Sequence, residues 1–106
     1  LVPGDMGTAS YVMAGPSSGT NRAFGSSCHG AGRAMSRTEA RQKIDGAKVK
    51  RELADKGVAI YETNEKYLSE EAPDAYKNVD DVIRLTEKAG LARPVARLKP
   101  VIVIKG

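Results

Sequence analysis

A stretch of twenty residues, positions 15–34, most constrains how this chain can fold, because it offers almost no side chains for burial. It is rich in glycine and serine, and it lies between an apolar segment and a helix signal. A compact domain rarely carries so long a segment without secondary structure unless that segment forms a site. The alternative interpretation is a disordered linker. We expect strands and helices to flank the loop and the loop to serve a site.

This stretch holds the only histidine and the only cysteine of the chain, His29 and Cys28, and Arg33 and Arg37 follow close behind. Glycines leave backbone N–H groups open to an anion, and the planar guanidinium of arginine matches a phosphate. A neutral imidazole can act as a base, a metal ligand or a nucleophile. The pattern predicts a site where a histidine meets a phosphate. A lone histidine in such a loop is, however, more often an ordinary polar residue.

The spacing of the basic residues adds to this hypothesis. A helix from about Gly30 onward would place His29, Arg33 and Arg37 on one face. Two like charges four residues apart repel by roughly 0.2–0.5 kcal/mol in a helix. A bound phosphate would relieve that repulsion.

Composition limits the class of protein. The 106 residues allow one modest domain, and 41% hydrophobic with 28% charged residues indicates a globular chain. The net charge of +4 favours polyanionic partners. A single cysteine excludes an internal disulfide framework and is typical of a reducing compartment, so we expect a cytoplasmic location. The sequence contains no apolar run of the ~18 residues that a membrane span needs, and no membrane partner is expected.

Local signals predict a mixed α/β (α+β) fold. Ser36 and Glu39 have the form of a capping box, Asn78 is a favourable N-cap, and Gly57 and Gly90 mark helix ends. The predicted elements are helices at 37–44, 47–56 and 79–89 and strands at 8–14, 58–61 and 101–104, the last strand buried, with a loop at 1–7, a short turn at 65–68 and a break at Arg93 and Pro94.

Two common kinds of site find no support. Gly15 and Gly19 lack the lysine that follows the glycines of a P-loop. One histidine and one cysteine cannot by themselves supply the usual ligands of a zinc site.

The charges at 37–56 are most simply explained as a solvated helix face.

Four blocks of the sequence carry a more specific signal: PGDMGTASYV at 3–12, GSSCHGAGR at 25–33 with MSR at 35–37, APDAYK at 72–77, and VIKG at 103–106. In this order, and over essentially the whole chain, they resemble the C-terminal part of the RtcB-type RNA-splicing ligases. The HGAGR core is the most specific of these motifs. The resemblance implies that residues 1–106 are the C-terminal portion of a single catalytic domain, cut just before Leu1, with the metal-binding part missing.

The resemblance implies an enzyme that joins RNA ends carrying a 2′,3′-cyclic phosphate or 3′-phosphate to 5′-hydroxyl ends, using GTP and Mn²⁺. The histidine at the position of His29 would attack the α-phosphate of GTP and form a histidine–GMP intermediate. The implied partners are GTP, RNA, either as tRNA halves in splicing or as broken RNA in repair, and archease as an activating protein.

The resemblance also assigns roles to residues. Tyr76 would stack on the guanine, Lys105 would donate to the nucleotide from the last strand, and Arg33 and Arg37 would bind phosphate or RNA. From the residues alone, Tyr76 is a half-buried aromatic and Lys105 a solvated terminal charge. The full set expected to bind GTP or GMP is Asp5, Ser10, His29, Gly30, Ala31, Gly32, Tyr76 and Lys105.

Asp5 departs from the family pattern, because some members carry a serine there. An acid is unfavourable beside phosphates unless it points at the base, the ribose or a metal. No metal ligands are expected in this chain, since those of the family lie upstream. We therefore expect the isolated chain to be inactive.

Two other classes of function compete with the ligase. A non-catalytic basic RNA-binding module would explain the charge and the glycine-rich loop, and it would tolerate His29→Ala. A structural subunit or degenerate homologue would have kept the fold without the chemistry, although the retained His29, Arg33, Arg37 and Lys105 argue against it.

Overall fold

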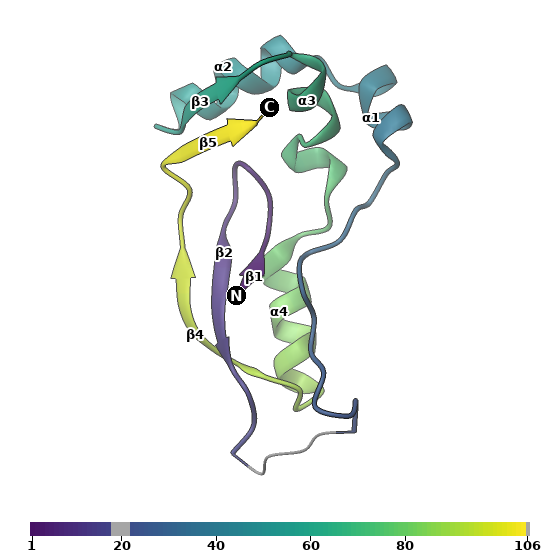
Figure 1. The fold of residues 1–106 in the computed structure, drawn as a ribbon, viewed down its shortest axis with the longest axis vertical. Coiled ribbons are helices and arrows are strands. Elements are labelled where there is room, and N and C mark those ends of the chain that lie inside the picture. Colours follow the sequence, from purple (N-terminus) through teal and green to yellow (C-terminus); the bar gives the residue numbers. More distant parts are fainter. Residues whose placement is uncertain (18–21, 106) are drawn as a thin grey trace.

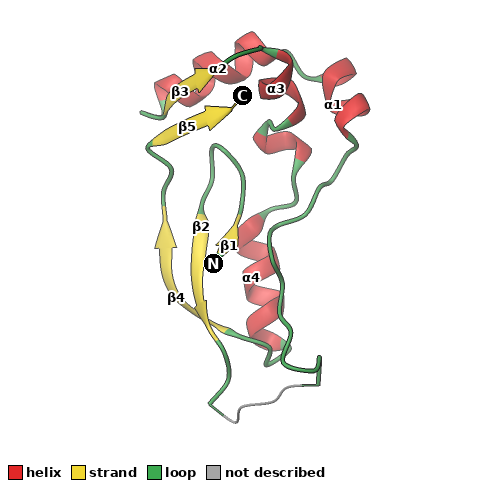
Figure 2. Ribbon diagram, viewed as in Figure 1, coloured by secondary structure: helices red, strands yellow, loops and turns green. Residues whose placement is uncertain are grey.

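Two separate sheets organise the chain, as the computed structural model shows for residues 1–17 and 22–105 (Figure 1). The predicted mixed α/β class is confirmed (Figure 2). Residues 18–21 of the expected loop, with Gly19, and Gly106 of the terminal block lie outside the described residues. The elements are strands β1 (Val2–Pro3), β2 (Ser10–Ala14), β3 (Ala59–Glu62), β4 (Arg93–Leu98) and β5 (Ile102–Lys105), helices α1 (Arg37–Lys43), α2 (Gly46–Asp55), α3 (Lys66–Glu70) and α4 (Val79–Lys88), and the 3₁₀ helix η1 (Pro73–Ala75).

The first sheet is antiparallel in the order β1-β2-β4, and α4 lies beside it in Figure 1. Its small core forms because α4 buries Val79 and Ile83 along one stripe, as its apolar spacing predicts. Val2 and Ala9 come from the sheet side, and Ala31 comes from the glycine-rich loop. One residue of that loop is therefore part of a hydrophobic core.

The second sheet is a parallel pair, β3 with β5, and α2 covers one face. Val103 pairs with Ile60 and is buried against Leu53 of α2. The prediction of a fully buried strand at 101–104 is wrong, because Ile102 and Ile104 are 58% and 78% exposed. A two-stranded sheet has two faces, and within the described residues only one of them is packed on a helix.

The turn between β1 and β2 connects the two halves (Figure 1). Met6 of this turn is buried in the core of the β3–β5 half, whereas Ala9, three residues later, is buried in the core of the α4 half. Two glycines make the turn possible. A Cβ on Gly4 would lie 2.0 Å from the Ala9 carbonyl oxygen, and one on Gly7 would lie 2.7 Å from Leu53 Cδ2.

Helix ends follow their local signals. Ser36 Oγ accepts from the Glu39 N–H at 3.1 Å, which confirms its role as the N-cap of α1. Asn78 Oδ1 accepts from the Asp80 N–H at 2.8 Å and caps α4. Gly57 has φ +82°, the left-handed conformation with which helices commonly end. The predicted boundaries of α1, α2 and α4 hold to within one residue.

Several other expectations are wrong. Residues 1–7 contain strand β1, and most of the turn expected at 65–68 belongs to helix α3. Leu68 of this helix is completely buried, and Asn64 Oδ1 accepts from the Lys66 N–H at 3.0 Å at its start. The break expected at Arg93 and Pro94 is the start of strand β4. Proline is tolerated there because β4 lies at the sheet edge and its register shifts between Val12 and Met13.

The helix expected from Gly30 does not form, because Gly32 has φ +76° and α1 begins only after Ser36. His29, Arg33 and Arg37 therefore do not stack on one helical face. In the two described ranges, no helix has the length and apolar character needed to cross a membrane.

Candidate functional site

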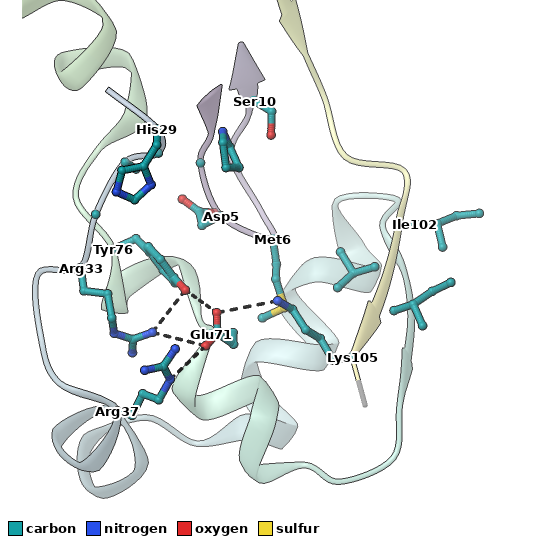
Figure 3. Close-up of a pocket in the computed structure, with 17 residues that line it drawn as sticks. Asp5, Met6, Ser10, His29, Arg33, Arg37, Glu71, Tyr76, Ile102 and Lys105 are labelled. Atoms are coloured by element: carbon teal, nitrogen blue, oxygen red, sulfur yellow. Dashed lines mark hydrogen bonds and ion pairs between the residues drawn. The ribbon is translucent and has the colours of Figure 1, made fainter. Parts of the chain in front are cut away.

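A cavity of about 540 Å³ lies where the two halves meet, a size within the usual range for small-molecule sites (Figure 3). Its walls come from the β1–β2 turn, the glycine-rich loop, the segment from α3 to Tyr76, and β5. All ten residues that were expected to bind nucleotide, phosphate or RNA line it, together with seven others. The lining residues are Pro3, Gly4, Asp5, Met6, Ser10, His29, Gly30, Ala31, Gly32, Arg33, Arg37, Glu71, Tyr76, Ile102, Val103, Ile104 and Lys105.

Backbone hydrogen bonds fix the loop that carries His29. The Ala31 N–H donates to the Pro3 carbonyl at 2.9 Å, and the Lys77 N–H donates to the Gly32 carbonyl at 2.9 Å. The positive φ of Gly32 turns the chain between these two bonds. His29, two residues before the first bond, is exposed at the cavity wall. An exposed imidazole on an anchored backbone is accessible to a ligand and to solvent.

Asp5 closes the β1–β2 turn. Its Oδ1 accepts from the Gly7 N–H at 2.8 Å and the Thr8 N–H at 3.0 Å, and its Oδ2 accepts from the Thr8 hydroxyl at 2.6 Å. Such turns are a common use of aspartate. The carboxylate thus has hydrogen-bond partners within its own turn. These bonds explain why an acidic residue is present in a cavity that is proposed to bind phosphates.

Glu71 is the site residue that the sequence analysis missed. Its Oε1 lies 3.4 Å from Arg33 Nη1 and 3.7 Å from Arg37 Nε, and its Oε2 accepts from the Tyr76 hydroxyl and lies 3.7 Å from Lys105 Nζ (Figure 3). Burial raises the pKa of the Glu71 carboxyl, but the Tyr76 hydrogen bond and the three positive charges outweigh burial and lower that pKa. The carboxylate is therefore stabilised in its charged form.

The two arginines differ in their surroundings. Arg33 donates from Nε to the Met35 carbonyl at 3.0 Å, from Nη2 to the Glu70 carbonyl, and from Nη1 to the Tyr76 hydroxyl at 3.2 Å. Arg37 is 64% exposed in its side chain, and its ion pairs with Glu70 and Glu71 are long, at 3.9 and 3.7 Å. Arg37 is thus the arginine better able to turn toward a ligand.

Tyr76 is held from two sides. The Arg33 guanidinium carbon lies 4.9 Å from the centroid of the ring, within the range of a cation–π contact. The hydroxyl donates to Glu71. Burial, followed by this hydrogen bond, raises the pKa of the Tyr76 phenol. The ring therefore stays neutral at physiological pH and has little freedom to rotate.

Cys28 belongs to the packing rather than to the cavity. The Thr86 hydroxyl lies 3.4 Å from its Sγ, and the side chain packs against the core of the α4 half. Over residues 1–17 and 22–105 no group of three or more histidine, cysteine, aspartate or glutamate side chains could hold a metal ion. His29 could supply one donor to a metal held by other residues.

The charged face expected for residues 37–56 is only partly solvated. Arg37 and Arg41 of α1 pair with Glu70 at the end of α3, and Lys50 of α2 pairs with Glu62 of β3 at 2.6 Å. These contacts tie the helices to the rest of the fold.

Local signals pointed to the loop but not to Glu71. Its partners lie at positions 33, 37, 76 and 105, so no short pattern in the sequence contains them. The one available hint is its place immediately before the APDAYK block, where a cavity residue follows five positions later.

Comparison with known proteins identifies the family. A family model described as "tRNA-splicing ligase RtcB" matches residues 1–106. Proteins named tRNA-splicing ligase RtcB are 46% identical in Pyrococcus abyssi and 47% identical in Methanopyrus kandleri and Archaeoglobus fulgidus, each over all 106 residues. The chain spans 12%, 11% and 22% of the lengths of these relatives, respectively. The four blocks, the cavity that they line and this match along the whole length lead to one conclusion: the chain belongs to the RtcB family.

Proposed function

We propose that this chain is part of a GTP- and Mn²⁺-dependent RNA ligase, and that it supplies the nucleophilic histidine and one wall of the nucleotide pocket. The observation that carries the proposal is the convergence of His29, Arg37, Tyr76 and Lys105 on one cavity of about 540 Å³. These residues come from three distant segments of the chain. The cavity is large enough for a nucleotide, and its groups include an aromatic ring that suits a base and cationic side chains that suit phosphates.

For an RNA end that carries a 3′-phosphate, the proposed reaction has three phosphoryl transfers; at a 2′,3′-cyclic phosphate, water would first attack the phosphorus and break its bond to O2′. A ring nitrogen of His29 attacks the α-phosphorus of GTP, so that an N–P bond forms, the P–O bond to the β-phosphate breaks, and pyrophosphate leaves. An oxygen of the RNA 3′-phosphate then attacks the same phosphorus and displaces the histidine. Finally, the 5′-hydroxyl attacks the RNA phosphorus, loses its proton, forms the phosphodiester and releases GMP. A covalent intermediate divides one difficult transfer into easier steps.

The exposed position of His29 supports the first step, because the nucleophile must reach the phosphorus in line with the leaving group. Arg37 would stabilise charge on the phosphoryl oxygens. Of the three loop residues after His29, Ala31 already donates its N–H to Pro3, so we assign backbone donation to Gly30 and Gly32. Ser10 lines the same wall from β2.

The nucleobase would lie at the Tyr76 end of the cavity. A neutral, fixed aromatic ring offers a stacking surface to a purine. The Lys105 ammonium can only donate hydrogen bonds, so it complements the O6 acceptor of guanine and not the N6 donor that adenine carries at the same position. This difference supports GTP over ATP as the nucleotide.

Manganese belongs to the proposal as a cofactor of the whole protein. The residues described here do not provide a donor set of three, so the remaining ligands would come from other parts of the protein. Mn²⁺ would supply positive charge at the phosphates. None of the steps above is assigned to a metal held by this chain.

The proposed substrate is RNA with a 2′,3′-cyclic phosphate or 3′-phosphate end, either tRNA halves or broken RNA. The net charge of +4 suits a polyanion, and the relatives carry tRNA splicing in their names. Archease is the proposed activating partner. Because the chain is a fraction of the length of its relatives, these partners are proposed for the whole protein.

The test uses the full-length protein, Mn²⁺ and GTP labelled on the α-phosphate. We expect a label on the peptide that contains His29, stable to alkali and labile to acid, as a phosphoramidate is. His29→Ala should remove the label. Cys28→Ala is the matched control, since it changes the neighbouring nucleophile, and it should retain the label. If GTP binds and no label forms, the ligase proposal is wrong and the RNA-binding module becomes the better hypothesis.

A further inference from the structure

Glu71 lies where four segments of the chain converge. It follows the last residue of α3, Tyr76 follows η1, Lys105 ends β5, and Arg33 belongs to the glycine-rich loop. One carboxylate oxygen faces Tyr76 and Lys105, and the other faces Arg33 and, at 3.7 Å, Arg37 (Figure 3). Segments that are far apart in sequence therefore share one acceptor.

The backbone on both sides of Glu71 is anchored. Its N–H donates to the Tyr67 carbonyl at 3.0 Å and closes the end of α3. Leu68, three residues earlier, is completely buried, and Ala72, the next residue, is 1% exposed. The Glu71 side chain itself is 18% exposed. The hydrophobic core thus sets the place of the carboxylate, and the carboxylate in turn can set the place of its partners.

Its partners need such an anchor. Lysine has a flexible side chain with four rotatable bonds, and its ammonium is 3.7 Å from Glu71 Oε2. Without this carboxylate, the ammonium would be attracted by the phosphates of a nucleotide in the same cavity. The Tyr76 hydroxyl likewise has two neighbours that fix it, Glu71 as acceptor and Arg33 as donor.

We propose that Glu71 is the positioning residue of this cavity: it holds the Tyr76 ring and the Lys105 ammonium where they select guanine. This inference rests on the proposed function. Arg33 belongs to the same arrangement, because its guanidinium donates to the backbone of Met35 and Glu70 and covers Tyr76. Glu71 itself does not contact the nucleotide, and phosphate binding falls to Arg37.

The experiment measures the dissociation constants of GTP and ATP for the full-length protein with Mn²⁺. Glu71→Gln keeps the size of the side chain and removes its charge, and we expect the preference for GTP over ATP to fall about tenfold. Glu70→Gln is the matched control. The Glu70 side chain is the last of α3 and 12% exposed, and its ion pairs go to Arg37 and Arg41 rather than to Tyr76 or Lys105, so the preference should stay within about twofold. Equal effects of the two substitutions would overturn the inference.

A double-mutant cycle with Tyr76→Phe separates positioning from general stability. This second substitution removes the same hydrogen bond from the other side and keeps the ring. If Glu71 acts through Tyr76, the two substitutions remove the same interaction. The free-energy preference for GTP over ATP should then fall clearly less in the double variant than the sum of the falls in the two single variants. Additive losses would contradict that route. Thermal melting checks that each variant folds. If Glu71→Gln does not fold, Tyr76→Phe alone decides, and an unchanged preference would overturn the inference.

The two proposals fail in different ways. If the wild-type protein shows no preference for GTP over ATP, the proposed function is wrong. If the wild-type protein prefers GTP and the Glu71 variant keeps that preference, only the positioning role is wrong.

Discussion

The glycine-rich loop and the segment from α3 to Tyr76 border the same cavity, yet they are built in opposite ways. The loop presents an exposed His29 on a backbone held by a few hydrogen bonds. The α3 segment is held by fully buried side chains, Leu68 and Ala75, and presents a network of ion pairs through Glu71. In the proposed function, the first region carries the reactive histidine and the second provides a fixed binding surface.

This difference explains why the two regions require different kinds of residue. A nucleophile must be accessible, so its loop is rich in glycine and small polar residues. A binding wall must keep its shape, so its side chains are anchored by the core and by charge. Substitutions in the two regions should therefore affect different measured quantities.

The largest expected effect on stability is in the wall. Leu68→Ala should lower the free energy of unfolding by about 2–5 kcal/mol, because the side chain is completely buried and leaves a cavity. Phe24→Ala in the loop should change it by less than about 0.5 kcal/mol, since Phe24 is fully exposed. Denaturant unfolding of the full-length protein measures both. Similar losses from the two substitutions would mean that the regions are not built differently.

The two arginines should separate stability from binding. Arg33→Ala should cost about 1–3 kcal/mol, because it leaves the Met35 and Glu70 carbonyls and the Tyr76 hydroxyl without their donor. Arg37→Ala should cost no more than about 1 kcal/mol, as expected for an exposed ion pair. In binding of RNA that ends in a 3′-phosphate, we expect the larger loss from Arg37→Ala. Melting curves and binding titrations on the same variants test this reversal, and the opposite order in either assay would refute it.

The smallest effect concerns pH. The pKa of Glu71 is lowered in the folded protein, so its charged form adds stability above the ordinary carboxyl pKa of about 4.5. That contribution is lost as the pH falls through the lowered value. The difference in melting temperature between the wild type and Glu71→Gln should therefore be constant near pH ~7 and shrink on acidification below ~4.5. A difference that grows with acidification would have the wrong sign for this network.

Local chemistry explains how much of this fold the sequence could predict. Ser36, Asn78 and Gly57 act within one turn of their own positions, so the helix ends that they specify were predictable. Helix α3 and strand β4 depend on distant contacts. Leu68 is buried by tertiary packing, and Pro94 is accommodated because β4 lies at a sheet edge and its pairing with β2 shifts in register beside Pro94.

The candidate site shows the same division. The loop could be found because its histidine, glycines and arginines are close together in the sequence and form a family motif. The role of Glu71 could not be predicted, because its partners Tyr76 and Lys105 are brought beside it only by folding. Asp5 differs from Glu71, because its partners lie only two and three residues away, and its use in a turn is a local signal that the sequence analysis did not apply.

The most direct test of this account is a crystal structure of the full-length protein after reaction with GTP and Mn²⁺. We predict continuous electron density from a ring nitrogen of His29 to the α-phosphorus, with guanine against Tyr76 and its O6 beside Lys105. Guanine bound away from Tyr76, or a nucleotide in the cavity with His29 unmodified and distant from the phosphorus, would contradict it.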